Sequence, residues 1–244
     1  MAKPIVARWE WRTFGAEFEE PEKRIRAHEQ GNFKESEEVY ILSRNSDENI
    51  KVRDDLLDIK SLQNVNEAKL EQWFPTMKAT FPIGREQLVE LFKVFKIPEP
   101  IFGRKEYSFE QFLNELVRPN QNLRLVNVKK KRYIYVINGA ICEIAETEFD
   151  GVALRTLCVE HEDPELVLKT VRELACEDYP NINYIQAMKK TVGMARWALC
   201  VPSSTSERTR SSSTSRNRWM TGRSGPSSTR TTSPVWAKGC GKPA

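Results

Sequence analysis

Hydrophobic and polar residues alternate with a period of two along much of the chain, a pattern typical of strands with one apolar face. The stretch 5–14 alternates in this way, with Trp9 and Trp11 on one face. Residues 38–62 repeat the pattern in three short runs separated by turn residues. Residues 70–81 predict a further strand or pair, interrupted at Pro75 because proline cannot donate a ladder hydrogen bond. The first third of the chain therefore predicts antiparallel strands.

A second set of strands is predicted between residues 123 and 163. A long basic strand ends at Asn138-Gly139, and the next ends at Asp150-Gly151, two pairs that tolerate positive φ in tight turns. The third strand is expected to run through Glu160-His161-Glu162, which would place both carboxylates on one face. His161 would then point the opposite way, as a surface or helix-side residue.

Apolar residues recur at helical spacing in the segments between these strands. Ser108 is a good N-cap for the helix that follows it, and Asp163-Pro164 is a typical helix start. The expected helices cover residues 17–30, 84–95, 108–117, a segment beginning at Pro164, and 182–191.

Charged residues recur on the second face of one predicted strand after another. Cations gather on the strand through Lys130 and Arg132, while Glu143, Glu146 and the late glutamates lie on the next two strands. This pattern favours an α+β fold in which an antiparallel β-barrel with a charged lumen is flanked by helices, as one domain over residues 1–192. An open sheet with a solvated, ion-paired face remains the alternative.

The net charge of +4 is unevenly distributed. Residues 203–244 contain eight Lys and Arg and one acid, a net charge of +7, which leaves −3 for the first 202 residues. Bulk charge therefore argues against nucleic acid as a partner. The five cysteines lack metal-ligand spacing, which favours reduced thiols acting as apolar filler and a cytoplasmic location. No apolar run is long enough to span a membrane, and the first residues predict no signal peptide.

In the charged-lumen interpretation, inward cations on facing strands can grip a chain of phosphates, since Arg binds phosphate oxygens in a bidentate manner. Glutamates beside them can hold Mg²⁺ or Mn²⁺, hard ions that take oxygen ligands and bridge to phosphate. The candidate phosphate-binding residues are Arg12, Lys51, Arg53, Lys60, Lys130 and Arg132. The candidate metal ligands are Glu10, Glu143, Glu160 and Glu162.

The order of these pairs resembles the CYTH domain, also called the triphosphate tunnel metalloenzyme fold. The matching motifs are Lys51-Val52-Arg53, Asp58-Ile59-Lys60, Lys130-Lys131-Arg132 and Glu160-His161-Glu162, and the resemblance covers about residues 5–175. It implies a triphosphate-tunnel-like barrel whose partner is polyphosphate or a nucleoside triphosphate. If active, the domain would hydrolyse a phosphoanhydride.

The first motif departs from that family. The family has Glu-x-Glu-x-Lys in the first strand, whereas Arg8-Trp9-Glu10-Trp11-Arg12 has an arginine at the first position and another at the last. A cation in place of a metal carboxylate should weaken metal binding, which favours ligand binding over turnover. A structural or protein-interaction module with a solvated charged face is the competing class.

Residues 193–244 predict a disordered low-complexity tail, because 18 of the residues from 203 onward are Ser or Thr and no hydrophobic period is present. Synonymous codons read one base out of frame across 202–214 permit V-V-D-V-G-T-N-S, which resembles the first phosphate loop of a Ppx/GppA phosphatase domain. The tail is therefore interpreted as a frameshifted remnant of an exopolyphosphatase, and the folded domain as an accessory part of a truncated hydrolase.

Overall fold

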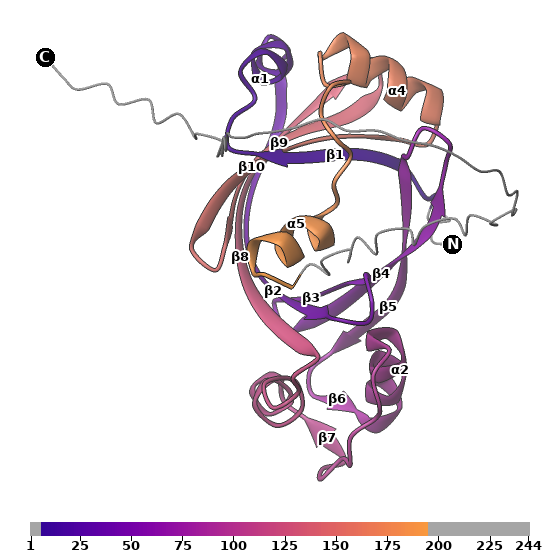
Figure 1. Ribbon diagram of the computed structural model, residues 1–244, viewed down its shortest axis with the longest axis vertical. Helices are drawn as coiled ribbons and strands as arrows, with labels where there is room; N and C mark the ends of the chain where they lie inside the picture. Colours follow the sequence, from indigo (N-terminus) through magenta and orange to yellow (C-terminus); the bar gives the residue numbers. More distant parts are fainter. Residues whose placement is uncertain (1–5, 195–244) are drawn as a thin grey trace, which may run out of the picture. The chain divides into compact units, whose positions relative to one another are not determined.

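The computed structural model describes residues 6–194, so all of the predicted tail except its first two residues lies outside the described residues. In this part of the chain, eight antiparallel strands close into a barrel in the order β1-β10-β9-β8-β2-β3-β4-β5 (Figure 1). The α+β fold with a closed antiparallel barrel and flanking helices is thus confirmed. None of the described helices is of a length and apolarity that would carry it across a membrane.

Strand pairing follows the turn chemistry of the sequence. Asn138 and Gly139 both have positive φ (52° and 89°), as do Asp150 and Gly151 (48° and 88°), so the two predicted tight turns join β8 to β9 and β9 to β10. The barrel strands are β1 (Trp9–Gly15), β2 (Gln30–Ser43), β3 (Asn49–Arg53), β4 (Leu56–Val65), β5 (Glu71–Thr80), β8 (Leu123–Ile137), β9 (Ala140–Phe149) and β10 (Val152–His161).

Helices α1 (Glu19–Arg26) and α4 (Pro164–Glu173) cover the barrel on the side of β1, β9 and β10 (Figure 1). Trp11 and Ile144 point outward from the barrel and pack with Ile25 of α1 and Val167 of α4 in one apolar cluster. Asp163 caps α4 as predicted, since its side chain accepts from the amide of Glu165. Trp11 therefore packs between the barrel and these helices.

The segment between β5 and β8 forms a small layer of its own below β3, β4 and β5 in Figure 1, and its apolar side chains form a second cluster with those of the barrel strands. Leu57 and Ile59 of β4 contribute the barrel side of this cluster, and Leu88 and Phe92 of α2 face them. The segment comprises β6 (Ile83–Gly84), α2 (Arg85–Phe95), β7 (Glu106–Tyr107), α3 (Phe109–Gln111) and a π-helical turn (Phe112–Val117). Ser108 caps α3 in a capping box with Gln111, as its sequence predicted.

The last helix, α5 (Tyr184–Thr191), lies across one end of the barrel in Figure 1 rather than on its outer surface. Ile185 and Met188 of α5 pack against inward-facing Tyr40, Val126 and Phe149 of the barrel strands. The sequence predicted this helix but not its position, because its apolar stripe does not reveal which apolar surface will receive it.

Several strand limits differ from expectation. Strand β1 begins at Trp9 rather than near residue 5, β4 continues to Val65, and β5 runs through Pro75 as one strand. Strand β2 begins at Gln30 instead of residue 38, because the polar run 30–37 pairs with β8 from Tyr135 to Lys129, with one register shift between Gln30 and Asn32.

Strand β10 ends at His161, one residue earlier than expected. The Nδ1 of His161 accepts a hydrogen bond from the amide of Asp163, where the chain turns into α4. Glu162 therefore lies beyond the strand and is exposed.

Candidate functional site

Side chains from strands all round the barrel meet in one polar pocket of about 150 Å³ in the lumen. Of the ten residues predicted from the sequence, eight line this pocket: Glu10, Arg12, Lys51, Lys60, Lys130, Arg132, Glu143 and Glu160. The structure therefore brings together most of the candidate set from six different strands. It adds residues that the sequence analysis did not identify: Glu38, Tyr40, Asn49, Trp73, Asn183, Tyr184 and Ile185.

Glu38 is the central carboxylate of the cationic side of the pocket. Its side chain is 2% exposed and accepts from Lys130 Nζ (2.7 Å), Lys51 Nζ (3.2 Å) and Arg53 Nη1 (3.4 Å). Burial alone would raise the pKa of Glu38, but the charges of Lys130 and Lys51 outweigh it and lower the pKa to about 2. These cations therefore keep Glu38 ionised, and Glu38 is in turn the counterion of all three.

Lys130 is fully enclosed between this carboxylate and two aromatic rings. Its Nζ donates to Glu38 and to Tyr40 Oη (2.8 Å), and lies 4.1 Å from the centre of the Tyr184 ring. Burial lowers the pKa of Lys130 to about 7, although Glu38 acts in the opposite direction. Lys130 therefore holds its proton less tightly than an exposed lysine does.

Arg12 and Arg132 hold a second buried carboxylate on the other side of the pocket. Arg12 Nη1 lies 3.2 Å from Glu143 Oε1, and Arg132 donates to Glu143 Oε2 from Nε (2.7 Å) and Nη2 (2.5 Å). Burial raises the pKa of Glu143, but the two guanidinium groups lower it overall. Arg12 also donates from Nε to Glu10 Oε1 at 2.8 Å.

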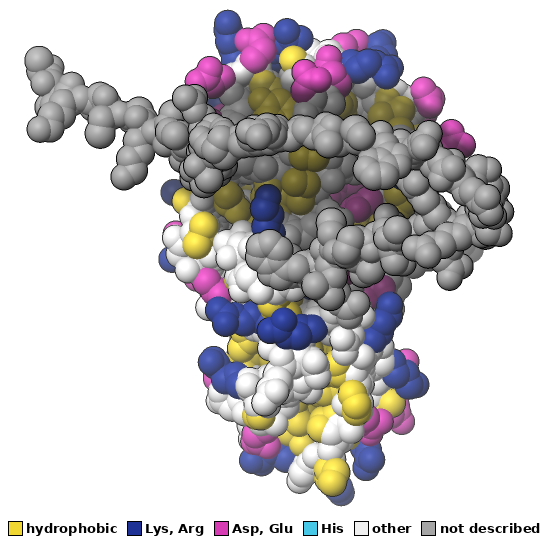
Figure 2. Space-filling model, in the orientation of Figure 1, with side chains coloured by type: hydrophobic (Ala, Val, Ile, Leu, Met, Phe, Trp, Pro, Cys, Tyr) yellow, Lys and Arg dark blue, Asp and Glu magenta, His cyan; other side chains and the backbone are white. Residues whose placement is uncertain are grey.

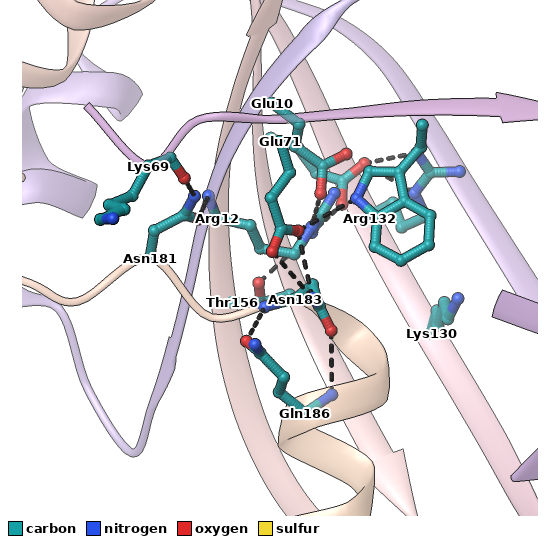
Figure 3. A network of polar contacts seen from close by, with 12 residues as sticks. Glu10, Arg12, Lys69, Glu71, Lys130, Arg132, Thr156, Asn181, Asn183 and Gln186 are labelled. Atoms are coloured by element: carbon teal, nitrogen blue, oxygen red, sulfur yellow. Dashed lines mark hydrogen bonds and ion pairs between the residues drawn. The ribbon is translucent and has the colours of Figure 1, made fainter. Parts of the chain in front are cut away.

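Figure 3 shows that Asn181 and Asn183, in the loop before α5, are joined to this network. Asn183 Nδ2 donates to both oxygens of Glu71 (3.0 and 3.1 Å), and Asn181 accepts from the amide of Arg12 while it donates to the carbonyl of Lys69. These contacts place Tyr184 against Arg12, whose guanidinium lies 4.7 Å from the ring centre. The start of α5 is therefore built into the wall of the pocket.

A row of carboxylates crosses three adjacent strands at the edge of the pocket. Glu10 is the direct register partner of both Glu160 on β10 and Glu71 on β5, so all three side chains leave the sheet on the lumen side. Burial and the charge of Glu10 raise the pKa of Glu160. Arg8 lies 3.9 Å from Glu160 Oε1, so the arginine that departs from the family motif offsets part of this negative charge.

The predicted set of metal ligands is only partly assembled. Both oxygens of Glu143 are occupied by arginines, and Glu162 lies outside the lumen. Within residues 6–194, no group of three or more His, Cys, Asp or Glu side chains is arranged to hold a metal ion. Glu10 and Glu160 are direct register partners on β1 and β10, and their carboxylate oxygens are the ligand type that Mg²⁺ prefers.

Arg53 lies at the rim of the pocket rather than inside it. Its side chain is 47% exposed and is shared between Glu38 and Asp54. The structure thus places five of the six candidate phosphate-binding residues in the lumen and the sixth at its edge.

The solvated, ion-paired face that competed with the lumen interpretation is also present, on the outer side of the same strands. Lys131 of β8 is in register with Glu35 and Glu146, and Lys129 with Glu37 and Glu148. Lys131 and Glu35 are 3.7 Å apart and both more than half exposed. Figure 2 shows a similar mixture of acidic and basic side chains over α1 and α4. The run 129–132 therefore alternates between solvent and lumen.

Tyr184 has a feature that points to a ligand: its hydroxyl is buried and has no hydrogen-bond partner among the described residues. A buried hydroxyl normally has a hydrogen-bond partner, and a hydroxyl that lines a polar pocket can donate to a bound anion.

We expect Tyr184→Phe to leave the free energy of unfolding within about 1 kcal/mol of the parent, yet weaken triphosphate binding about tenfold. Thermal unfolding and calorimetry measure the two effects. A substitution that lowered stability without changing affinity would show that the hydroxyl has only a structural role.

No family model and no curated protein matches the chain. Among solved structures, PH1012 from Pyrococcus horikoshii is 20% identical, covers 73% of this chain and 97% of its own, and has a TM-score of 0.42. The putative adenylyl cyclase HpAC1 from Hippeastrum is 13% identical over 75% of this chain and 96% of its own, with a TM-score of 0.43, and is described as having a dominant triphosphatase activity.

Proposed function

We propose that the lumen binds a triphosphate group, as tripolyphosphate, the end of a polyphosphate chain or a nucleoside triphosphate. The observation that carries the proposal is the convergence of Arg12, Lys51, Lys60, Lys130 and Arg132 on one pocket. These cations come from four strands, β1, β3, β4 and β8, so they can contact successive phosphates from several sides. A solvated sheet face does not require such convergence.

Four of the five lumen cations are paired with buried glutamates, and this bears on how phosphate would bind. Glu38 engages Lys51 and Lys130, while Glu143 engages Arg12 and Arg132. Each cation has donors beyond those used on the carboxylate, because Arg has five N–H groups and Lys three. A phosphate chain can therefore be added beside the two glutamates, which keep the cations extended toward the lumen. Tyr184 supplies one more donor from α5.

A divalent cation fits this proposal as a companion of the ligand. Glu10 and Glu160 would hold Mg²⁺ or Mn²⁺ together with phosphate oxygens, and the ion would neutralise phosphate charge and lower the pKa of its bound water. Because Arg12 and Arg8 already contact these two carboxylates, we expect weak metal binding until phosphate is present. This arrangement favours binding over turnover, which agrees with the arginine at the first motif position.

Calorimetry with tripolyphosphate, with and without Mg²⁺, tests the proposed function. We expect one ligand per chain and an increase in affinity when Mg²⁺ is present, whereas Mg²⁺ alone should give little heat. Release of inorganic phosphate in the same mixtures separates a hydrolase from a binding domain. The absence of binding heat at millimolar tripolyphosphate would leave the interaction-module alternative.

The pH dependence of binding should follow Lys130. A lysine whose folded-state pKa is lowered to about 7 carries its charge below that pH and loses it as the pH rises through 7. Triphosphate affinity should therefore decrease between pH 6 and pH 9, and Lys130→Met should show a flatter profile with weaker binding at pH 6. The groups that surround Lys130 are Glu38, Tyr40, Lys51, Arg132 and Tyr184.

The outward-facing neighbour provides the control for this profile. Lys129→Met changes an exposed side chain that lies 4.0 Å from Glu148, so the pH profile should remain that of the parent. Equal pH profiles for the parent and Lys130→Met would contradict a role for Lys130 in ligand binding.

A role as the accessory part of an exopolyphosphatase is a further part of the proposal. Its support is the frame-shifted reading of residues 202–244, which lie outside the described residues. Resequencing the gene tests it: the shifted frame should stay open for roughly 300 codons, the size of a two-lobed catalytic unit. A stop codon within a few dozen codons would contradict it.

A further inference from the structure

We propose that the unpaired edge of strand β2, residues 30–38, is an interaction surface for a second copy of this chain. The two copies would pair edge to edge as antiparallel strands, about a two-fold axis at Phe33. The inference does not depend on the proposed function, because none of residues 30–37 lines the lumen pocket.

Strand β2 has a neighbouring strand on only one side for most of its length. On that side it pairs with β8 from Gln30 to Ser43. On the other side, β3 pairs with Val39 and Tyr40 alone, because β3 is five residues long and ends at Arg53. Among the described residues, no strand pairs with 30–38 on this side. The backbone groups of every second residue there point away from β8, and such an edge is a template for another strand.

The outer face of this edge carries an exposed aromatic side chain. Phe33 is 44% exposed and is the direct register partner of Tyr133, and the two ring centres are 5.1 Å apart. The guanidinium of Arg26 lies 5.3 Å from the centre of the Tyr133 ring. A row of stacked groups therefore runs across the sheet and stops at the edge of β2. A second Phe33 placed opposite the first would continue this row, since aromatic pairs stabilise neighbouring strands and bury apolar surface.

The charges of the edge exclude most registers of such a pairing. In two-fold antiparallel pairing, one residue lies opposite its own copy, and the residues on either side of it are matched in order. An axis at Lys34, Glu35 or Glu37 places two like charges directly opposite each other. An axis at Ser36 places Glu35 opposite Glu37. Like charges in these positions are destabilising.

An axis at Phe33 opposes no like charges. It places Asn32 opposite Lys34 and Gly31 opposite Glu35. An axis at Asn32 avoids like charges as well, but it sets Phe33 opposite Gly31, which has no side chain to pack against the ring. The charge pattern and the exposed ring therefore favour the same register, and a two-fold contact of this kind closes with two copies.

The contact is expected to be short. The register shift between Gln30 and Asn32 interrupts the start of the strand, so the pairing should extend from Gly31 to Glu35 in each copy. Small interfaces are weak, so the dimer should form reversibly as the protein concentration rises.

Sedimentation velocity of the full chain over a wide range of concentration tests the proposal. We expect a monomer–dimer equilibrium that Phe33→Lys weakens at least about tenfold, because it removes the aromatic pair and places two lysines opposite each other. Val152→Lys is the matched control: it adds the same charge at a valine that is 49% exposed at the start of β10. This variant should keep the dissociation constant within about twofold of the parent. Thermal unfolding confirms that each variant is folded.

Two substitutions at one exposed position test the register. Asn32→Asp places a carboxylate opposite Lys34 of the second copy, so it should tighten the dimer roughly threefold or more, whereas Asn32→Lys should weaken it by a similar factor. A monomer at every concentration would overturn the proposal, as would equal effects of Phe33→Lys and Val152→Lys. Changes in the same direction for the two Asn32 variants would overturn the axis at Phe33. None of these results affects the proposed function, which calorimetry with tripolyphosphate tests separately.

Discussion

Glu38→Gln should lower the free energy of unfolding by about 3–5 kcal/mol at neutral pH, the usual cost of removing one partner from a buried ion pair. The reason is that Glu38 is the shared partner of Lys130, Lys51 and Arg53. Without its charge, Lys130 must remain buried without a counterion or lose its proton. Urea denaturation measures the change.

The control for this substitution lies on the opposite face of the same strand. Glu35→Gln removes a carboxylate that is more than half exposed and 3.7 Å from Lys131, so its effect should remain below about 1 kcal/mol. A comparable decrease in the free energy of unfolding for both variants would contradict the claim that Glu38 stabilises the fold as a shared buried counterion.

Two further measurements connect the Glu38 effect to pH and to ligand. The lowered pKa of Glu38 contributes stability that is present above its ordinary value, 4.5, and is lost as the pH falls toward 2. The difference between parent and Glu38→Gln should therefore shrink over that acid range. Tripolyphosphate should restore part of the lost stability at neutral pH, because a ligand that binds only the folded state stabilises it.

Arg132→Met should weaken tripolyphosphate binding by about 10- to 100-fold, the loss expected for charge-assisted hydrogen bonds to an anion. Arg132 lines the lumen pocket beside Lys130, and its guanidinium is fixed there by Glu143. Competition or calorimetric titration at constant salt gives the ratio of dissociation constants.

Lys131→Met is the matched control, because it removes one positive charge from the adjacent residue of the same strand. Lys131 faces solvent and pairs with Glu35, so its loss should change the affinity less than twofold at physiological salt. If both substitutions weaken binding equally, the ligand is held by the general charge of the strand. The lumen would then not be the binding site.

The sequence predicted the barrel because its strands carry two alternating patterns at once. Apolar residues such as Trp11 and Ile59 mark the face that meets helices, and the charged residues between them mark the lumen. The turns at Asn138-Gly139 and Asp150-Gly151 then fix the register of three strands. Glu162 was misplaced because a period of two says nothing about where a strand ends.

Other parts of the site depend on packing that local patterns do not encode. Glu38 directly follows the polar run 30–37, in which charged residues occur at both inward and outward positions. The burial of Glu38 therefore depends on the pairing of this strand with β8. Alternation with Tyr40 and Leu42 was a signal that could have identified it. Tyr184 enters the lumen because α5 is fastened by Asn183 and Lys189, contacts across more than a hundred residues of sequence.

A crystal structure of the protein with tripolyphosphate bound tests the central claim most directly. We predict phosphate density inside the barrel, contacting Arg12, Lys130 and Arg132, with its innermost phosphate toward Tyr184 and α5. Density on the outer face around Lys129 and Lys131, with the lumen unchanged, would contradict the account.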